Sequence, residues 1–373
     1  MGWAPSGNHI LFISDRSGTW DAWAIRVANG KAQGTARLIK QQIGPVEPLG
    51  FTRPGDCLYR VSTPNSNIYS ATIDPQTHKL VGRPEKMVRR FMGRNQAPDW
   101  SPDGKQLAYV SQRGPFSPGF RSPWTLVVRT METGVERELP LDLTNEWKWL
   151  GPNWSPDGRF LLANGRNSKR VYGLDRINVQ TGDIQRITSA TGTPTWSKDG
   201  QSVIYARYDE PSNSRLFLER HLETGAENEL WRQTEEYGIR GIEMSPDDQE
   251  LLLYSTDRLQ VLPATGGEPR QLIKIEQDGI GRITGAVWSV DGQYVLFSRS
   301  NGHLWRIKAS GGQTEHLGEG LDDSGLRIRL SMHPDGTRLA FHGQYGPETT
   351  DHVMALENFE AALADTSLSV DER

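Results

Sequence analysis

The amino-acid sequence predicts an all-β fold, a β-propeller of four-stranded antiparallel blades with eight blades in the ring. A short turn motif recurs eight times along the 373 residues, at a spacing of roughly 42 to 54 residues that is typical of propeller blades. A short apolar run follows six of the copies, and no helical period persists before the C-terminus. The length could hold two or three domains, but a continuous repeat favours a single one.

The motif is clearest in Trp100-Ser101-Pro102-Asp103-Gly104, which returns unchanged at residues 154–158. Looser copies begin at Trp3, Phe51, Trp196, Met244, Trp288 and Met332. Pro-Asp-Gly favours a tight turn because glycine tolerates a positive φ. The motif therefore predicts the turn between the first and second strands of each blade.

Apolar runs such as 107–110, 160–163 and 294–297 follow these turns and predict buried second strands. Later Thr-Gly turns, at residues 133–134 and 181–182 for example, predict the hairpin that closes each blade. Such a sheet buries both faces only between neighbours that are arranged around an axis. We therefore expect the large residue that opens each motif, apart from Phe51, to pack in the seam between blades.

The Trp-Ser-Pro-Asp-Gly turn, the Leu107-Ala108-Tyr109 strand, Ser14-Asp15-Arg16 and the Thr-Gly turns together resemble the TolB-type, WD40-like (PD40) propeller repeat. The resemblance covers nearly the whole chain. Members of this family include periplasmic scaffold proteins, propeller domains of peptidases and a few polysaccharide lyases, so the resemblance implies the fold and leaves the function open. It favours a bacterial protein of the periplasm or extracellular space, of which this chain is one domain.

The repeat divides the expected propeller into blades at about residues 1–39, 40–90, 91–140, 141–188, 189–231, 232–275, 276–318 and 319–359, with a C-terminal tail at 360–373. Trp3 lies so near the start that no room is left for the innermost strand of the first blade. We expect residues 366–370 of the tail to supply that strand, with disorder of the tail as the alternative.

Composition narrows the classes of function. The formal net charge of −4 lacks the basic surplus of a nucleic-acid-binding domain. Cys57 is the single cysteine, so we expect no intrachain disulfide and a buried small residue at this position. The chain has no apolar run of about 18 residues and no signal peptide. We expect a monomer without a membrane span.

Strand order places the Pro-Asp-Gly and Thr-Gly turns on one face of the propeller. The opposite face, here named the connector face, carries the second-to-third-strand loops and the connectors between blades, where binding usually resides. Six second strands end in an arginine at this face: Arg16, Arg113, Arg166, Arg207, Arg258 and Arg299. If they point to the axis, they form a cationic ring for carboxylates or phosphates. In the alternative interpretation each pairs with a nearby acid such as Asp15, Asp209 or Asp257.

Trp147 and Trp149 lie in the connector between the third and fourth blades, spaced to share one face of an extended segment. They could form a stacking platform for a sugar or for a side chain of a partner. The alternative is burial against the rim of the blades.

Three histidines are candidates for a divalent metal site. His303 and His352 open the third strands of the last two blades, and His342 ends a second strand. Oligogalacturonate lyases, which the repeat resembles in architecture, use a histidine-rich metal site near the propeller axis, but no ligand matches residue by residue. The sequence therefore predicts no cofactor, and a hydrogen-bonded or solvated side chain is the alternative for each histidine.

Common catalytic motifs are absent: the sequence has no G-x-S-x-G, H-E-x-x-H or P-loop. The leading prediction is a non-enzymatic binding or scaffold propeller that recognises a protein segment or an anionic glycan on the connector face. The competing prediction is a polysaccharide lyase acting on uronate-containing polymers. There an arginine would neutralise the carboxylate, and a histidine, tyrosine or arginine would take the neighbouring proton.

Overall fold

The computed structural model describes residues 2–14, 16, 21–41, 43, 46–88, 94–112, 124–139, 143–144, 151–167, 171–190, 192–234, 238–275, 281–321 and 329–357. Regular structure in these residues is β, and none of it forms a helix long and apolar enough to cross a membrane. The chain divides into two compact units. The first, here named the terminal unit, includes residues 2–65 and 349–357 of the described chain. The second, the ring unit, includes residues 66–112 and 124–348.

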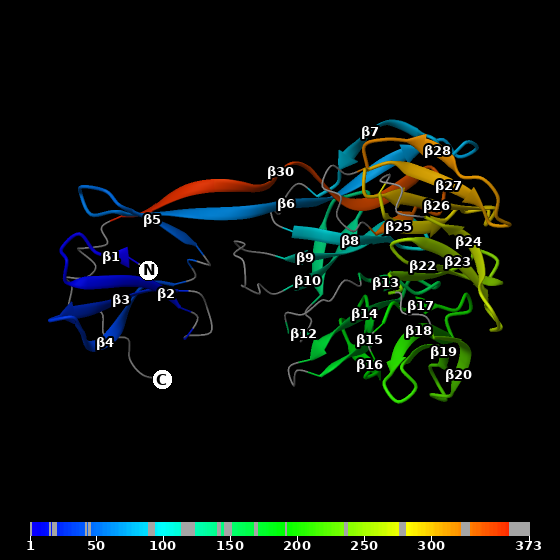
Figure 1. The fold of residues 1–373 in the computed structure, drawn as a ribbon, viewed down its shortest axis with the longest axis horizontal. Helices are drawn as coiled ribbons and strands as arrows, with labels where there is room; N and C mark the ends of the chain where they lie inside the picture. The colour runs from blue at the N-terminus through cyan, green and yellow to red at the C-terminus, as the bar shows by residue number, and fades with distance from the viewer. Residues whose placement is uncertain are drawn as a thin grey trace. The chain divides into compact units, whose positions relative to one another are not determined.

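Five antiparallel sheets of the ring unit each come from one stretch of chain, and they follow one another from cyan to orange in Figure 1. The first contains β8 (Arg94–Trp100), β9 (Gln106–Gln112), β10 (Trp124–Thr130) and β11 (Glu136–Leu139). The second contains β12 (Leu143–Thr144), β13 (Asn153–Trp154), β14 (Phe160–Asn167), β15 (Tyr172–Asn178) and β16 (Ile184–Thr188). The third contains β17 (Thr195–Trp196), β18 (Ser202–Asp209), β19 (Ser214–His221) and β20 (Glu227–Gln233). The fourth contains β21 (Gly241–Met244), β22 (Glu250–Tyr254), β23 (Arg258–Pro263) and β24 (Arg270–Lys274). The fifth contains β25 (Ile283–Trp288), β26 (Tyr294–Arg299), β27 (Leu304–Lys308) and β28 (Glu315–Gly318).

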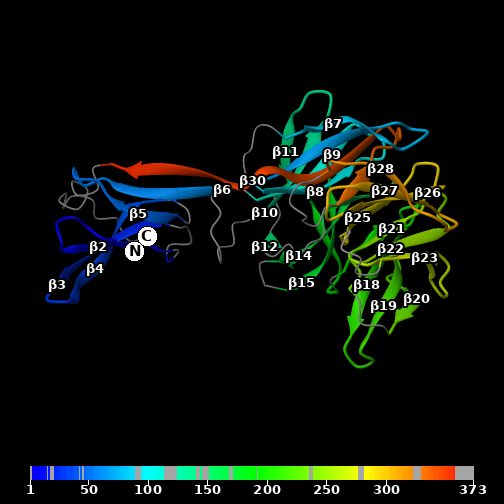
Figure 2. The same ribbon diagram turned by 45° about the horizontal axis from the view of Figure 1, so that its top comes forward.

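The sixth sheet of the ring unit combines distant parts of the sequence. Its strands are β29 (Leu330–Met332), β30 (Arg338–Leu356), β6 (Cys57–Ile73) and β7 (Leu80–Lys86). The long strands β6 and β30 lie side by side in Figures 1 and 2. Residues 66–73 and 338–348 belong to the ring unit, whereas the other ends of the two strands belong to the terminal unit. Both boundaries between the units therefore fall inside a strand.

The innermost strands of the six sheets form a closed ring. Contacts follow the order β8, β13, β17, β21, β25 and β29, and β29 in turn contacts β8. The predicted all-β fold with four-stranded antiparallel blades is confirmed. The eight repeats are distributed between the two units: the third to seventh give one ring sheet each, the second and eighth share the sixth, and the first lies in the terminal unit. The shared sheet arises because β6 and β30, with 17 and 19 residues, far exceed the usual length of about 5–6 residues.

The terminal unit contains the sheet β1 (Gly2–Trp3), β2 (His9–Ser14), β3 (Asp21–Ala28) and β4 (Lys31–Lys40), together with β5 (Glu47–Phe51), which pairs with β6. The innermost strand is Gly2–Trp3 itself, which pairs with β2 and corrects the expectation that no residues remain for it. The proposed tail strand lies outside the described residues. Cys57 is buried, as predicted.

The tryptophans of the motif pack in the seams of the ring unit, as predicted. Trp100, Trp154, Trp196 and Trp288 are all buried. The indole Nε1 of Trp154 donates a hydrogen bond of 3.0 Å to the carbonyl of Asp99 in the preceding sheet, and that of Trp196 donates one of 3.1 Å to the carbonyl of Asn153. Each indole thus links its own sheet to the innermost strand of the one before.

Trp3 is the exception, because 54% of it is exposed. The prediction of a seam position is wrong for this residue. The first motif lies in the terminal unit, where β1 borders an apolar cavity of about 290 Å³ instead of a neighbouring ring sheet.

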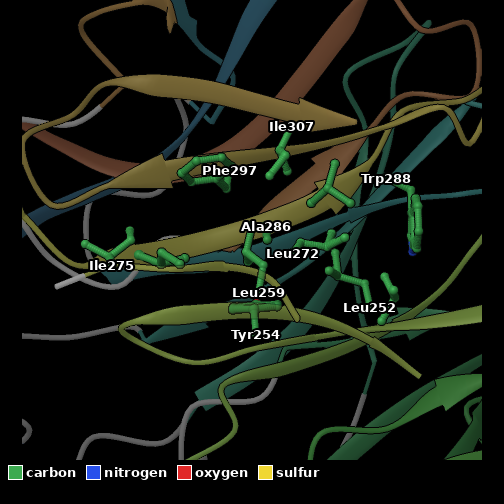
Figure 3. Packing of buried hydrophobic residues seen from close by; sticks show 12 residues of the cluster. Leu252, Tyr254, Leu259, Leu272, Ile275, Ala286, Trp288, Phe297 and Ile307 are labelled. Atoms are coloured by element: carbon green, nitrogen blue, oxygen red, sulfur yellow. The ribbon is translucent and has the colours of Figure 1, made fainter. Parts of the chain in front are cut away.

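Apolar side chains fill the spaces between neighbouring sheets. Between the fourth and fifth sheets, side chains such as Leu252, Leu259 and Phe297 point toward one another from both sides (Figure 3). Phe297 and Leu259 have no exposed surface. The ring unit is therefore held together by one apolar layer per seam, which alternates with the sheets.

Hydrogen bonds inside the turn explain why the motif pairs serine with aspartate. In the fifth sheet, the hydroxyl of Ser289 donates to Asp291 Oδ1 at 2.5 Å and accepts the N–H of Tyr294 at 3.0 Å. Ser101, Ser155 and Ser245 make the same pair of contacts in their own turns. The serine is thus the polar centre of the turn.

Replacing Ser289 with alanine should lower the free energy of unfolding by about 1–2 kcal/mol, because the N–H of Tyr294 loses the hydroxyl of the fully buried Ser289 as its partner. Urea unfolding measures the change. Ser310→Ala removes an exposed hydroxyl from the same sheet and should leave the midpoint unchanged. Equal midpoints for both variants would contradict this role of Ser289.

Candidate functional site

Three charged side chains meet at the axis of the ring: Asp99 of β8, Glu243 of β21, and Arg329, which immediately precedes β29. We name them the axial cluster. The sheets of β8 and β21 stand on opposite sides of the six-membered ring. The pKa of Glu243 nevertheless responds to the charges of both Asp99 and Arg329. Side chains from opposite sheets influence each other in this way only when they approach the axis.

Arg329 is fixed at its backbone and reaches toward Asp99. Its Nη2 lies 3.7 Å from Asp99 Oδ1. Nδ1 of the buried His342 accepts the N–H of Arg329 at 3.4 Å and the N–H of Ala97 at 3.3 Å. Gly151 leaves room mainly for Ala97, since a Cβ there would lie 2.2 Å from the Cβ of Ala97, and it would also lie 3.2 Å from Arg329 Nη1.

The carboxylate of Asp99 has three polar neighbours, which come from the second and sixth sheets: Arg329, Trp154 and Ser331. Its Oδ2 accepts the backbone N–H of Trp154 at 2.8 Å, and its Oδ1 accepts the hydroxyl of Ser331 at 3.1 Å. Burial still raises the pKa of this carboxyl, against the opposing effects of Arg329 and of the two hydrogen bonds. The ionised form of Asp99 is therefore incompletely stabilised.

The pKa of Glu243 is raised as well. Burial raises its pKa to about 8, and the charge of Asp99 adds to the rise, whereas Arg329 and the N–H of Trp288 oppose it. Near pH 7 this carboxyl is mostly protonated. The axial cluster thus has two carboxyl groups but only one cation.

Arg329 lies at the connector-face end of the ring, whereas Asp99 and Glu243 stand one residue before the ends of β8 and β21, next to the turns of the opposite face. β29 runs from Arg329 toward the Pro334-Asp335-Gly336 turn, so that the start of the strand faces the connectors. The side chains of Asp99 and Arg329 remain 14% and 25% exposed, and Glu243 is partly buried. Solvent therefore reaches the cluster.

The arginines predicted from the sequence are held within their own sheets where the structure describes them. Arg207 pairs with Glu227 at 3.4 Å, and Arg258 pairs with Asp257 at 3.0 Å. The buried Arg299 lies over the ring of Trp305, 5.4 Å from its centroid. Arg16 belongs to the terminal unit and lies over Phe12 and Trp23.

Three other predicted residues, Arg113, Trp147 and Trp149, lie outside the described residues. Arg166 is placed in β14, but its side chain is not described. The arginine ring and the tryptophan platform stay predictions.

The predicted histidines do not share one site. Nδ1 of His342 accepts the backbone N–H groups of Ala97 and Arg329. His352 is exposed in the terminal unit, whereas His303 lies in the ring unit beside His316 and Glu319.

The axial cluster was not predicted from the sequence, although the sequence contains a signal for it. Asp99 and Glu243 each stand one residue before the large residue of the motif, and Arg329 stands three before it. Charged residues at these positions of an innermost strand would have marked the axis.

Together these features define the class of protein: a β-propeller with a closed ring of six sheets, a polar axis and a further β unit. No family model matches the chain. Its structure is similar to that of a putative TolB from Agrobacterium tumefaciens, with a TM-score of 0.55 and 18% identity over 76% of this chain and 99% of the other. The chain therefore has the fold of the TolB-type propellers, as its repeat predicted.

Two curated bacterial proteins are similar in sequence over a part of their length. Uncharacterized protein Atu1656 of Agrobacterium fabrum is 31% identical over 113 residues, which is 30% of this chain and 35% of that protein. Uncharacterized peptidase YuxL of Bacillus subtilis is 22% identical over 204 residues, or 54% of this chain and 29% of that protein. The chain thus spans only about a third of each relative.

Proposed function

We propose that this chain is a binding propeller that takes a basic side chain of a protein segment at the axis of its ring. One observation carries the proposal: the axial cluster has two carboxyl groups for one guanidinium, and the pKa of Glu243 is raised to about 8. A buried carboxyl without a cation stays protonated because its ionised form is poorly solvated.

A lysine or arginine that enters the axis of the ring would supply the missing charge. It would ionise Glu243 and donate charge-assisted hydrogen bonds to both carboxylates. The peptide around that residue would lie across the mouth of the ring, where a rigid scaffold commonly presents its binding loops. Arg329 would hold Asp99 in place.

Binding of a basic peptide should release a proton, and this release tests the proposal. At pH 7 Glu243 is mostly protonated in the free chain, so a short lysine-containing peptide should displace up to about one proton per chain. Calorimetry in two buffers of different ionisation enthalpy measures the release. The same peptide with glutamine in place of lysine should bind more weakly by at least ~10-fold, because no cation enters the axis.

Variants of Asp99 and Glu243 test whether the proton release on peptide binding comes from the axial cluster. The double variant Asp99→Asn, Glu243→Gln should show no proton release. It should also bind the lysine peptide more weakly, by at least ~10-fold. Glu268→Gln, an exposed carboxyl between β23 and β24, should change neither. Equal binding of both peptides, or unchanged proton release in the double variant, would contradict the proposal.

An anionic glycan is the second candidate, and a separate observation favours it. Arg94 begins β8, while Arg240 and Arg282 immediately precede β21 and β25, so three guanidinium groups besides Arg329 start at the connector-face end. The predicted arginine ring would extend this positive surface. Calorimetric binding of oligogalacturonate without binding of the lysine peptide would favour the glycan.

The lyase alternative requires a base beside Arg329. His342 is the histidine in contact with the Arg329 backbone, and its Nδ1 accepts two backbone N–H groups, which leaves the proton on Nε2. A neutral imidazole of this tautomer cannot take a substrate proton at Nδ1. A time-dependent rise in ultraviolet absorbance with a uronate polymer would overturn the binding proposal.

A further inference from the structure

His303, His316 and Glu319 form a cluster on the fifth sheet and share no residue with the axial cluster. One ligand atom of each lies within 4.8 Å of the others. Nε2 of His303 is 3.8 Å from Oε1 of Glu319, and the rings of His303 and His316 have centroids 5.0 Å apart. We propose that these three residues bind a divalent transition metal ion, with zinc as the preferred ion.

The chemistry of the donors fits zinc. Two imidazoles and one carboxylate are a common ligand set for this ion, and imidazole also suits copper and nickel. Metal–nitrogen distances of about 2.0–2.1 Å place tetrahedral ligand atoms about 3.3 Å apart. The distances here exceed this value by an amount that side-chain rotation can supply, since Glu319 is 69% and His303 is 29% exposed.

The backbone holds the three residues together before any ion binds. His303 follows a tight turn in which the N–H of Gly302 donates to the carbonyl of Arg299, and the N–H of Arg299 donates to the carbonyl of His303. Gly302 has a φ of 76°, which favours glycine at this point of the turn. The turn therefore fixes the direction in which His303 leaves the chain.

The same turn also holds Glu319. The carbonyl of Gly302 accepts the N–H groups of Gly320 and Leu321, at 3.1 Å and 3.0 Å. Leu321 is fully buried, so the segment after Glu319 is tied to the core. His316 is placed by the ladder of β27 and β28, in which it pairs with Trp305, and its ring lies 4.9 Å from that indole.

Three protein ligands leave a tetrahedral ion one open position. Such a site keeps water there or takes a donor from a bound molecule. The cluster lies at the start of β27 and the end of β28, on the same face as the second-to-third-strand loops. A zinc ion bound there would be accessible to a partner on the connector face.

Titration of the metal-free full chain with zinc tests the proposal. Calorimetry should show one zinc ion bound per chain. Cobalt(II) should give the intense visible absorption of a four-coordinate ion at the same stoichiometry. His316→Ala and Glu319→Gln should each weaken zinc binding by at least ~10-fold and remove the cobalt absorption.

His352→Ala removes an exposed histidine of the terminal unit and should bind zinc as the unchanged chain does. Because His316 and Glu319 are exposed, their variants should keep the melting temperature of the metal-free chain. Zinc binding that is absent in the unchanged chain, or that persists unchanged in His316→Ala, would overturn the assignment.

Discussion

Phe297→Ala should lower the free energy of unfolding by about 3–5 kcal/mol, the largest effect expected of a single substitution here. Phe297 has no exposed surface and packs between the fourth and fifth sheets with Leu259, Ile307 and neighbouring side chains (Figure 3). Truncation removes apolar contacts and leaves a cavity in a layer that joins two sheets. Urea unfolding followed by tryptophan fluorescence measures the change.

Val290→Ala is the matched control, because Val290 lies in the turn after β25 of the same sheet and is 46% exposed. Its free energy of unfolding should stay within about 0.5 kcal/mol of that of the unchanged chain. If Phe297→Ala unfolded at the midpoint of this control, the seam layers would not be the main source of stability in the ring.

The second prediction concerns the pH dependence of stability. The pKa of Glu243 is about 8 in the folded chain, above the ordinary value of 4.5. Between these values the unfolded chain has lost a proton that the folded chain retains, so the free energy of unfolding falls as pH rises from about 4.5 to about 8. At about 1.4 kcal/mol per pKa unit the total is on the order of a few kcal/mol.

Glu243→Gln keeps the shape of the protonated carboxyl and removes its titration. Relative to the unchanged chain, this variant should gain stability progressively as pH rises through that window. Asp99 also has a raised pKa and contributes in the same direction, whereas Arg329 opposes both shifts. Asp99 and Arg329 are present in both chains, so the difference isolates Glu243.

Thermal melts at pH 5, 6, 7 and 8 provide the comparison, with Glu268→Gln as the exposed control. A difference between Glu243→Gln and the unchanged chain that did not grow with pH would show that Glu243 is ionised in the folded state. It would also remove the basis for the proton release expected on peptide binding.

The repeat made the sheets predictable from sequence, because local signals determine them. Ser289, Asp291 and Gly292 form a turn with their own side chains and backbone, and the apolar run of the following strand is visible in its own residues. The burial of Trp154 and Trp196 also followed from the repeat, since every ring sheet has the same neighbours.

The distribution of the repeats between two units depends on strand pairing between segments that are far apart in sequence, which the motif does not encode. Phe51-Thr52-Arg53-Pro54-Gly55 resembles the other motifs, yet the strand after it continues to Ile73 and joins the ring only in its second half. The axial cluster was missed for a related reason. Asp99, Glu243 and Arg329 are far apart in sequence, and only the closure of the ring makes them neighbours.

The sixth sheet also constrains the order in which the ring forms. Tyr69 and Ile73 pack with Leu339 and Phe341, roughly 270 residues later in the chain. During synthesis, residues 66–73 and β7 emerge before the five intervening sheets. They can complete their own sheet only after β29 and β30 have been synthesised. In that interval they expose unpaired strand edges and apolar side chains, which favour aggregation or exchange with a second copy. We expect closure of this sheet to be the slow step of folding, and the step most dependent on chaperones.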